Sequence, residues 1–210
     1  NTWETFSADT AAKDYGDAQW FNGTDSYVNS SAHIATIASK TKGRIDLDFV
    51  ISEIGAISQL FGASYDVQGS TDCAIRVTAA GKIQVIVRDN GVQSLRYDSD
   101  NAVQVGVKYT LSLRVTASGN ELYLDNVLQA VTYATGSSST VSWFNDVSNL
   151  NSLTTGVNFD DGGLPEFWFK GSIFNLTVFD EDNTTALISY TGLSPTPWAD
   201  TIGSNNGTPS

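Results

Sequence analysis

Apolar and polar residues alternate with a period of two along much of the chain. In residues 44–51 the apolar side chains stand mainly at the odd positions and the polar side chains at the even positions. The same alternation runs through residues 73–77, 83–87 and 109–116. Because successive side chains of a strand point to opposite faces of a sheet, each run predicts a strand with one row against a core and the other toward solvent.

Short turn sequences separate these runs. They include Ala79-Ala80-Gly81, Asp89-Asn90-Gly91, Ser118-Gly119-Asn120 and Asp125-Asn126. Turns of this composition, spaced at about 8–12 residues between alternating runs, are typical of antiparallel hairpins in a sandwich or barrel. No stretch keeps a helical period between helix caps. The pattern therefore predicts an all-β domain built as an antiparallel two-sheet β-sandwich.

The two ends of the chain depart from this pattern. Residues 1–17 contain aromatic side chains without clean alternation, and we expect an N-terminal edge strand or lead-in there. Residues 194–210 are rich in Pro, Ser, Asn and Gly, which is typical of a C-terminal linker or closing strand. The predicted sandwich domain therefore covers residues 18–193. The chain starts at Asn1 and contains no methionine, so we interpret it as a processed or excised segment of a longer protein.

The charge balance narrows the classes of partner. The 210 residues include 23 acidic and 11 basic side chains, which gives a net charge of −12. Nucleic-acid binding depends on Lys and Arg that neutralise phosphates, and attraction to an anionic membrane surface depends on the same residues. No apolar run reaches the roughly 18 residues of a transmembrane helix. We therefore expect no nucleic acid and no membrane insertion, and neutral polar ligands or cations stay open as partners.

Cysteine and histidine are scarce. Cys73 is the one cysteine, which excludes an internal disulfide and a metal site built from several thiolates. His33 is the one histidine, so a zinc site based on histidines is excluded and a catalytic triad has little support. A chain almost free of thiols suits a protein that works outside the cell.

Four parts of the chain, in order, carry a family resemblance. They are residues 21–28 (FNGTDSYV), 45–51, 109–115 with 121–126, and 169–179 (FKGSIFNLTVF). Their order and spacing resemble the strands of the laminin-G-like or concanavalin A-like lectin/glucanase jelly roll, over residues 18–192. The resemblance implies a jelly-roll β-sandwich. The family includes glucanases and polysaccharide lyases as well as lectins, and it often binds calcium at loops beside the ligand site.

Residues 143–151 combine the side chains that lectins use to bind sugars. An aromatic ring packs on the C–H side of a pyranose, while carboxylates and amides form paired hydrogen bonds to its hydroxyls. We predict that Trp143 stacks on a sugar and that Asn145 and Asp146 bond to its hydroxyls. The segment follows a flexible Gly/Ser stretch and does not alternate, so it is expected to be a loop. In the alternative interpretation, Trp143 and Phe144 close the end of the sandwich.

A second candidate site lies at residues 158–163 (NFDDGG). Adjacent carboxylates beside glycines allow several oxygens to converge on a hard cation, and calcium prefers about six to eight oxygens. We predict that Asp160 and Asp161 position a calcium ion or bond directly to sugar hydroxyls. Residues 98–101 and 180–183 are comparable acidic turns, and acidic turns also arise by chance in a chain of this charge.

An enzyme of the same fold is an alternative class. Asp46 and Asp48 share one face of a predicted strand, roughly 6.5–7 Å apart along it, whereas a retaining glycosidase needs carboxyl groups about 5–5.5 Å apart. Glu53 falls on the opposite parity, so no glutamate joins them. A lyase would need a base such as His33 with a tyrosine partner. We therefore interpret Asp46 and Asp48 as solvated side chains and predict no catalytic residues.

These observations together predict a non-catalytic, lectin-like module of a larger extracellular or virion surface protein, such as an adhesin or a phage tail or capsid appendage. Its partners would be cell-surface or polysaccharide glycans, and calcium is the one cofactor considered. A structural virion or cell-surface module is an alternative, in which aromatic patches bind neighbouring subunits or a second copy of the chain. A glycanase or polysaccharide lyase acting through Asp46 and Asp48 is the other alternative.

Overall fold

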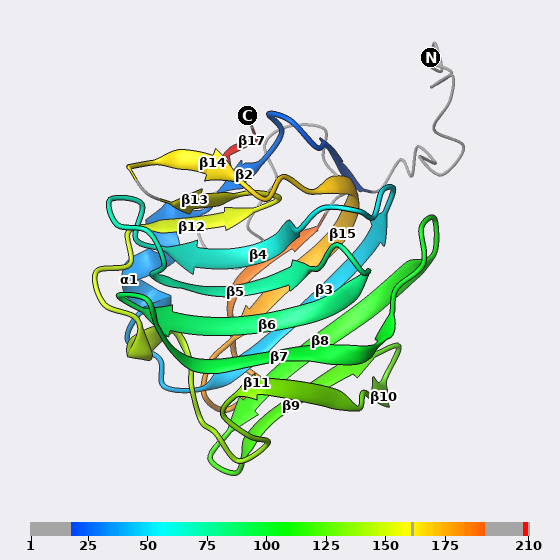
Figure 1. Cartoon of the computed structure of the whole chain (residues 1–210). Helices are drawn as coiled ribbons and strands as arrows, with labels where there is room; N and C mark the ends of the chain where they lie inside the picture. Colours follow the sequence, from blue (N-terminus) through cyan, green and yellow to red (C-terminus); the bar gives the residue numbers. More distant parts are fainter. Residues whose placement is uncertain (1–17, 161, 192–207, 210) are drawn as a thin grey trace.

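Two antiparallel β-sheets, packed face to face, form the computed structural model of the protein, which describes residues 18–160, 162–191 and 208–209 (Figure 1). We name them sheet A and sheet B. The strands follow the alternating runs of the sequence, and the predicted all-β, two-sheet sandwich is confirmed.

Sheet A contains seven strands in the described part of the chain. Their order is β1–β15–β3–β8–β9–β10, and β16 pairs with β15. The strands span Gln19–Asn22 (β1), Gly43–Ile51 (β3), Lys108–Thr116 (β8), Gly119–Leu124 (β9), Val127–Leu128 (β10), Lys170–Phe179 (β15) and Ala186–Thr191 (β16).

Sheet B contains eight strands, in the order β11–β7–β6–β5–β4–β12–β2–β17. They span Val28–Asn29 (β2), Ser58–Ser64 (β4), Asp72–Val77 (β5), Lys82–Asp89 (β6), Val92–Ala102 (β7), Val131–Thr135 (β11), Ser152–Thr155 (β12) and Thr208–Pro209 (β17). A separate two-stranded pair consists of Asn158–Asp160 (β13) and Leu164–Glu166 (β14).

The core lies between the sheets and is built from the odd-numbered rows that alternation predicts. Ile45, Leu47 and Phe49 of β3, with Ile75 of β5 and Val85 of β6, are at most 2% exposed and belong to one hydrophobic cluster. Full burial of such a side chain stabilises the fold by about 1.5–3 kcal/mol. These rows therefore hold the two sheets together.

Two tight turns occur where the sequence predicts them. Asn90-Gly91 joins β6 to β7 with φ values of 49° and 80°, and Asp125-Asn126 joins β9 to β10 with φ values of 51° and 63°. Positive φ at both central residues is the type I′ geometry, whose twist matches that of antiparallel strands. These turns set the pairing of the strands on either side.

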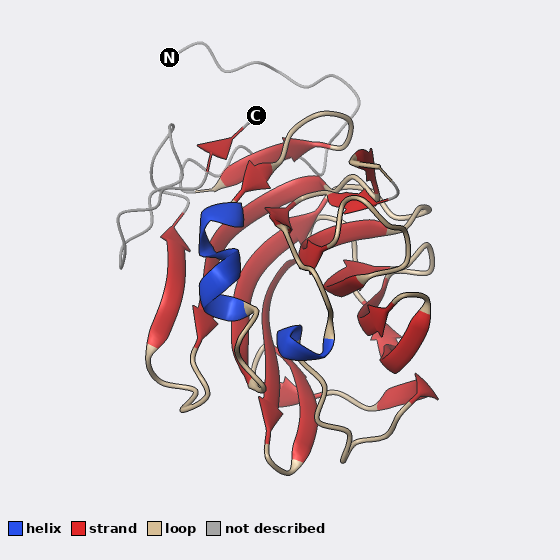
Figure 2. Ribbon diagram, turned by 90° about the vertical axis from the view of Figure 1, so that its left-hand side faces the viewer, coloured by secondary structure: helices blue, strands red, loops and turns tan. Residues whose placement is uncertain are grey.

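Short helical segments lie at one end of the sandwich (Figure 2). They are η1 (Ser31–His33), α1 (Ile34–Ile37) and η2 (Phe144–Asp146). Within the ranges that the structure describes, no helix is long and apolar enough to cross a membrane.

The predicted chain ends fall largely outside the described residues. Residues 1–17 lie outside them, and so does most of the predicted C-terminal linker at residues 194–210. The short strand β17 pairs with β2. The division of the chain into a lead-in, a domain and a linker stays a prediction.

Candidate functional site

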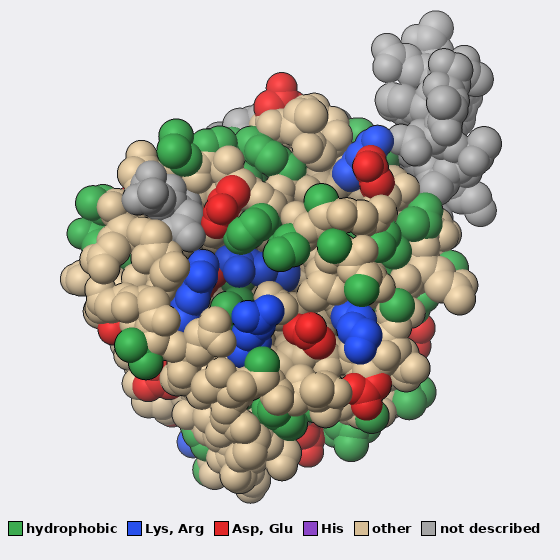
Figure 3. Space-filling model, viewed as in Figure 1, with side chains coloured by type: hydrophobic (Ala, Val, Ile, Leu, Met, Phe, Trp, Pro, Cys, Tyr) green, Lys and Arg blue, Asp and Glu red, His purple; other side chains and the backbone are tan. Residues whose placement is uncertain are grey.

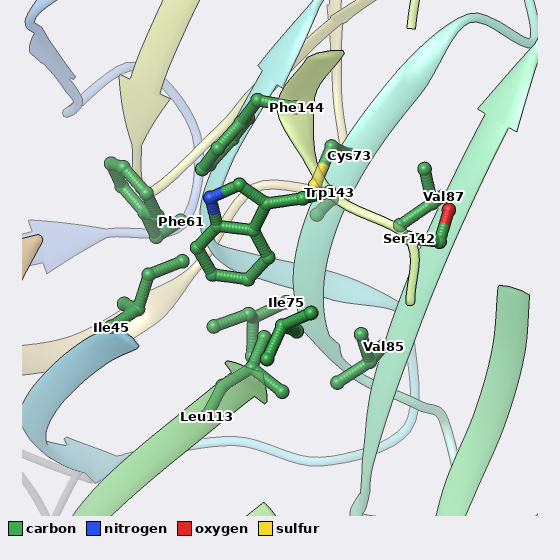
Figure 4. A pocket seen from close by; sticks show the side chains of 12 residues that line it. Ile45, Phe61, Cys73, Ile75, Val85, Val87, Leu113, Ser142, Trp143 and Phe144 are labelled. Atoms are coloured by element: carbon green, nitrogen blue, oxygen red, sulfur yellow. The ribbon is translucent and has the colours of Figure 1, made fainter. Parts of the chain in front are cut away.

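Trp143 is buried in the core, which contradicts its predicted role in stacking on a sugar. Trp143 is 1% exposed, and its ring lies edge-on to that of Phe144 with 5.0 Å between the ring centroids. Figure 4 shows the indole among apolar side chains that include Ile45, Phe61 and Leu113. The apolar pair at positions 143 and 144 closes the end of the sandwich, as in the alternative interpretation, because the open edge between the sheets would otherwise expose the core.

Asn145 and Asp146 are exposed beside this buried pair. The carboxylate of Asp146 accepts a hydrogen bond from the backbone N–H of Trp143 at 3.1 Å, so it stabilises η2. The backbone N–H of Asn145 donates to the carbonyl oxygen of Lys40 at 3.2 Å. Sugar binding by Asn145 and Asp146 stays a prediction, without the aromatic partner that was expected beside them.

The predicted calcium site lies at the margin of the described structure. Asp161 is outside the described residues, and Asp160 is described only as part of the backbone of β13. In the remainder of the described chain, no group of three or more His, Cys, Asp or Glu side chains is placed to hold a metal ion. Calcium binding by Asp160 and Asp161 stays a prediction.

The side chains considered for catalysis are engaged elsewhere. Asp46 lies 3.1 Å from the Nε atom of Arg44, and Asp48 accepts a hydrogen bond from Asn175 at 3.1 Å. His33 lies buried in η1, 5% exposed. Asp46 and Asp48 do share one sheet face, as the alternation predicts, but each carboxylate is already bonded within that face.

Three arginines lie on the outer face of sheet B, and the sequence analysis did not single them out. They are Arg76 of β5, Arg88 of β6 and Arg96 of β7. On each of these strands the odd-numbered residues enter the core, so the even-numbered residues point outward. Figure 3 shows Lys and Arg side chains gathered near the middle of this face.

The strand register brings these arginines within reach of one another. Asp72 of β5 pairs with Arg88 of β6, and Ile86 of β6 pairs with Arg96 of β7. Arg88 and Arg96 are thus diagonal neighbours, a separation of about 7–8 Å at the backbone that long side chains can bridge. A single anionic group could therefore contact both guanidinium groups.

Asp72 holds two of the arginines in place. Its carboxylate, which is only 1% exposed, accepts hydrogen bonds from Nη2 of Arg76 and from Nε of Arg88. Arg88 also donates from Nη1 to the hydroxyl oxygen of Ser70 at 3.3 Å. Burial lowers the pKa of the Arg76 guanidinium from its ordinary value, and the carboxylate of Asp72 opposes that shift. Arginine keeps its proton at neutral pH even so, and Arg76 and Arg88 are two cations held around the carboxylate of Asp72.

The β13–β14 hairpin covers one side of this face. The backbone N–H of Gln59, on β4, donates to the carbonyl oxygen of Phe167 at 2.7 Å. The Phe167 ring centroid lies 4.7 Å from the guanidinium carbon of Arg76. Phe167 has a φ of 54°, a value that residues other than glycine seldom adopt. Phe167, which directly follows β14, therefore lies against Arg76 at one side of this face.

Arg96 differs from the other two arginines because its charge is not balanced. It is partly buried, and no hydrogen bond or ion pair joins its guanidinium to another residue of the described chain. Buried or partly buried charges are normally paired. Nearby, Nε2 of Gln84 donates to Asp98 at 2.8 Å, and both side chains lie on the same face. Gln84 is buried, so the face offers an unpaired cation beside the half-buried carboxylate of Asp98, which can accept hydrogen bonds from hydroxyls.

No protein-family model and no curated protein matches this chain. Solved structures do match. The CBM40 carbohydrate-binding module of the IT-sialidase of Ruminococcus gnavus, bound to α2,3-sialyllactose, superposes with a TM-score of 0.65 and 19% identity, over 78% of this chain and 89% of the module. The K499G mutant of the NanB sialidase of Streptococcus pneumoniae gives a TM-score of 0.64 and 18% identity, over 81% of this chain and 26% of NanB.

The leech intramolecular trans-sialidase, complexed with 2,7-anhydro-Neu5Ac, matches with a TM-score of 0.61 and 17% identity, over 86% of this chain and 28% of the enzyme. At these identities the similarity establishes the fold alone. It confirms a lectin-like, jelly-roll β-sandwich. The narrower assignment to the laminin-G or concanavalin A superfamily stays a prediction.

Proposed function

We propose that this chain is a non-catalytic carbohydrate-binding module that binds an acidic, sialylated glycan on the outer face of sheet B. The observation that carries the proposal is Arg96, whose guanidinium has no partner in the described chain and lies diagonal to Arg88. The similarity in fold to a module that binds sialyllactose supports the same ligand class. A sialic acid offers one carboxylate and several hydroxyls, which suits this mixture of groups.

The proposed contacts follow from the chemistry of the face. Arg96 and Arg88 donate N–H groups to the carboxylate of the sugar, and charge-assisted bonds of this kind are among the strongest in proteins. Arg88 is already held by Asp72, so little side-chain freedom is lost on binding. Asp98, which is half-buried on the same face, accepts hydrogen bonds from the sugar hydroxyls.

The net charge of −12 makes this ligand unexpected from composition, which favoured neutral ligands or cations. Electrostatic effects between exposed charges are largely screened beyond about 8 Å at physiological ionic strength. The acidic groups elsewhere on the surface therefore weaken binding less than the two nearby arginines strengthen it. The local arrangement of charge, and not the total, decides which ligand this face accepts.

The experiment is calorimetric titration of the protein with 3′-sialyllactose and with lactose. Binding of sialyllactose alone is expected. Arg96→Gln should weaken it by about 10- to 100-fold, since one charged hydrogen bond contributes about 1.5–3 kcal/mol. Arg114→Gln, the same change on the outer face of sheet A, is the matched control and should leave the affinity unchanged. Equal binding of both sugars, or equal binding by the Arg96 variant, would contradict the proposal.

We make two further proposals that come from the sequence alone. One is the extracellular or virion-surface setting, which the low thiol content of the chain supports. The other is calcium bound by Asp160 and Asp161. A titration repeated with calcium and then with EDTA tests the second, because calcium at these residues would raise the affinity for glycan or the melting temperature, and the chelator would reverse the effect.

A further inference from the structure

Arg96 and Asp98 are neighbours on one face of β7. Leu95 and Tyr97 of the same strand belong to the hydrophobic core, so the side chains at positions 96 and 98 both point to the outer face of sheet B. Positions two apart on a strand are separated by about 6.5–7 Å at the backbone. Both side chains are half-buried. A cation and an anion therefore lie side by side on the face that we propose to bind a glycan.

These two charges do not neutralise each other. In the ranges that the structure describes, no ion pair joins Asp98 to Arg96 or to any other basic side chain. Instead, Nε2 of Gln84 donates a hydrogen bond to Oδ1 of Asp98 at 2.8 Å. Gln84 is 4% exposed and lies opposite Asp98 in the register of β6 and β7, so it fixes the position of the carboxylate. Because an amide carries no charge, the negative charge of Asp98 is not balanced.

The carboxylate of Asp98 can accept further hydrogen bonds. It has about four lone-pair sites, and the bond from Gln84 occupies one of them at Oδ1. A hydroxyl or an amide N–H of a ligand that approached the carboxylate would form a charge-assisted hydrogen bond. The separation of about 6.5–7 Å is one that a single pyranose and its substituents can span. A sugar acid whose carboxylate contacts Arg96 can therefore donate to Asp98 from the same sugar.

Asp98 has the opposite effect on a ligand with more negative charge. Any anion held by Arg96 lies near the carboxylate of Asp98, and like charges repel. A sugar carboxylate carries a single negative charge, whereas a phosphate monoester carries about −1.5 to −2 at neutral pH. The repulsion is thus larger for the phosphate, and a phosphate without hydroxyl groups gains no hydrogen bond to Asp98 in return. Specific binding sites combine attraction and repulsion in this way.

We propose that Asp98 determines which anionic ligands bind to the outer face of sheet B. It favours a singly charged sugar acid that carries a hydroxyl or an amide N–H near its carboxylate, and it disfavours phosphorylated ligands. This inference rests on the proposed function. It assigns the attraction of anions to Arg96 and the choice between anions to Asp98.

The test compares 3′-sialyllactose with methyl phosphate, which has no sugar hydroxyls. Each is titrated into the whole chain at about pH 8, where a phosphate monoester is doubly ionised, and is followed by ¹H–¹⁵N NMR. Asp98→Asn keeps the size of the side chain and removes its charge. It should weaken the binding of sialyllactose by about 3- to 10-fold and strengthen that of methyl phosphate by about 2- to 5-fold. A merely structural role of Asp98 would move both affinities in the same direction.

Asp100→Asn is the matched control, because it removes the same charge from the same strand. Asp100 is exposed, and its Oδ1 accepts a hydrogen bond from the hydroxyl of Thr132 at 2.7 Å. It lies four positions from Arg96, roughly 13 Å along an extended strand. Exposed charges more than about 8 Å apart are largely screened, so neither affinity should change by more than about 2-fold.

A second variant guards against an effect on folding. Asp98→Ser also removes the charge and should give the same opposite changes, so a folding defect in one variant does not decide the test. If sialyllactose binding depends on Arg96 but does not weaken in the Asp98 variants, or if methyl phosphate binds them no more tightly than the wild type, the role of Asp98 is overturned and the proposed function stands. Equal changes in Asp100→Asn would attribute the effect to net charge and would also overturn that role. No binding of sialyllactose by the wild type would overturn both.

Discussion

The outer faces of both sheets carry basic side chains, but the two faces pair them differently. On sheet A, Arg44 lies 3.1 Å from Asp46 and 3.8 Å from the ring centroid of Phe179. Lys108 of the same face likewise lies 4.0 Å from the ring centroid of Phe174. On sheet B, Arg96 has no such partner in the described structure. The unpaired charge of Arg96, and not the number of charges, is therefore the feature from which we infer that the outer face of sheet B binds a ligand.

The largest expected change is a loss of stability when Asp72, which bonds to Arg76 and Arg88 on sheet B, is replaced. Asp72→Ala would leave Arg76 and Arg88 without their shared carboxylate, and we expect a loss of about 3–5 kcal/mol in the free energy of unfolding. Asp48→Ala on sheet A is the control, because its ion pair with Lys108 is partly exposed and such pairs contribute about 0–1 kcal/mol. Urea unfolding measures both variants, and equal losses would show that the two faces do not differ in this way.

A pair of arginine variants sharpens the comparison by separating stability from binding. Arg96→Gln should change the free energy of unfolding by no more than about 0.5 kcal/mol, because Arg96 has no partner to lose, while it reduces the affinity for sialyllactose. Arg44→Gln should lower the free energy of unfolding by about 0.5–1 kcal/mol and leave the affinity for sialyllactose unchanged. Denaturant unfolding and calorimetry on the same samples check both. Destabilisation by Arg96→Gln would mean that its guanidinium has a structural role.

Salt should weaken the binding of 3′-sialyllactose less than the Arg96→Gln substitution does. Raising the ionic strength from about 0.15 M to 1 M shortens the screening length from about 8 Å to 3 Å. We expect the affinity for 3′-sialyllactose to fall by about 2- to 10-fold, since the contact to Arg96 is partly exposed. Calorimetric titration at the two salt concentrations makes the measurement. A salt-independent affinity would argue against an arginine–carboxylate contact.

The smallest change in affinity for sialyllactose is expected from a substitution in residues 143–151, where the sequence predicts the glycan site. Asn145 belongs to η2, which lies with the other short helical segments at one end of the sandwich (Figure 2). Asn145→Ala should therefore leave the affinity for sialyllactose unchanged, as the titration used for Arg96→Gln would show. A loss as large as that of Arg96→Gln would return the glycan site to residues 143–151.

The strands could be predicted because alternation is a local property. Residues 73–77 and 83–87 alternate in the sequence, and in the strands that they form Arg76 and Arg88 lie in the even-numbered row, on the side away from the core. What alternation could not supply was the register between strands. The pairing of β6 with β7 shifts between Val87 and Arg88, and such an irregularity decides which side chains become neighbours. The charged cluster was therefore visible as separate residues but not as one site.

Trp143, in contrast, was assigned to a binding site from the sequence but is buried in the core. Its segment lacks alternation, so the sequence indicated a loop, and aromatic residues in loops are common in binding sites. Burial of Trp143 depends on the open end of the sandwich, which is a property of the two packed sheets and not of the segment itself. The β13–β14 hairpin over sheet B was unpredictable for the same reason, because its contact with Gln59 joins residues about a hundred positions apart.

A crystal structure of the protein with 3′-sialyllactose would show whether Arg96 and Arg88 bind the carboxylate of the sugar. We expect the sugar carboxylate within about 2.7–3.2 Å of guanidinium nitrogens of Arg96 and Arg88, on the outer face of sheet B. Sugar bound instead at the η2 end beside Asn145 and Asp146, or a carboxylate that points away from both arginines, would contradict it.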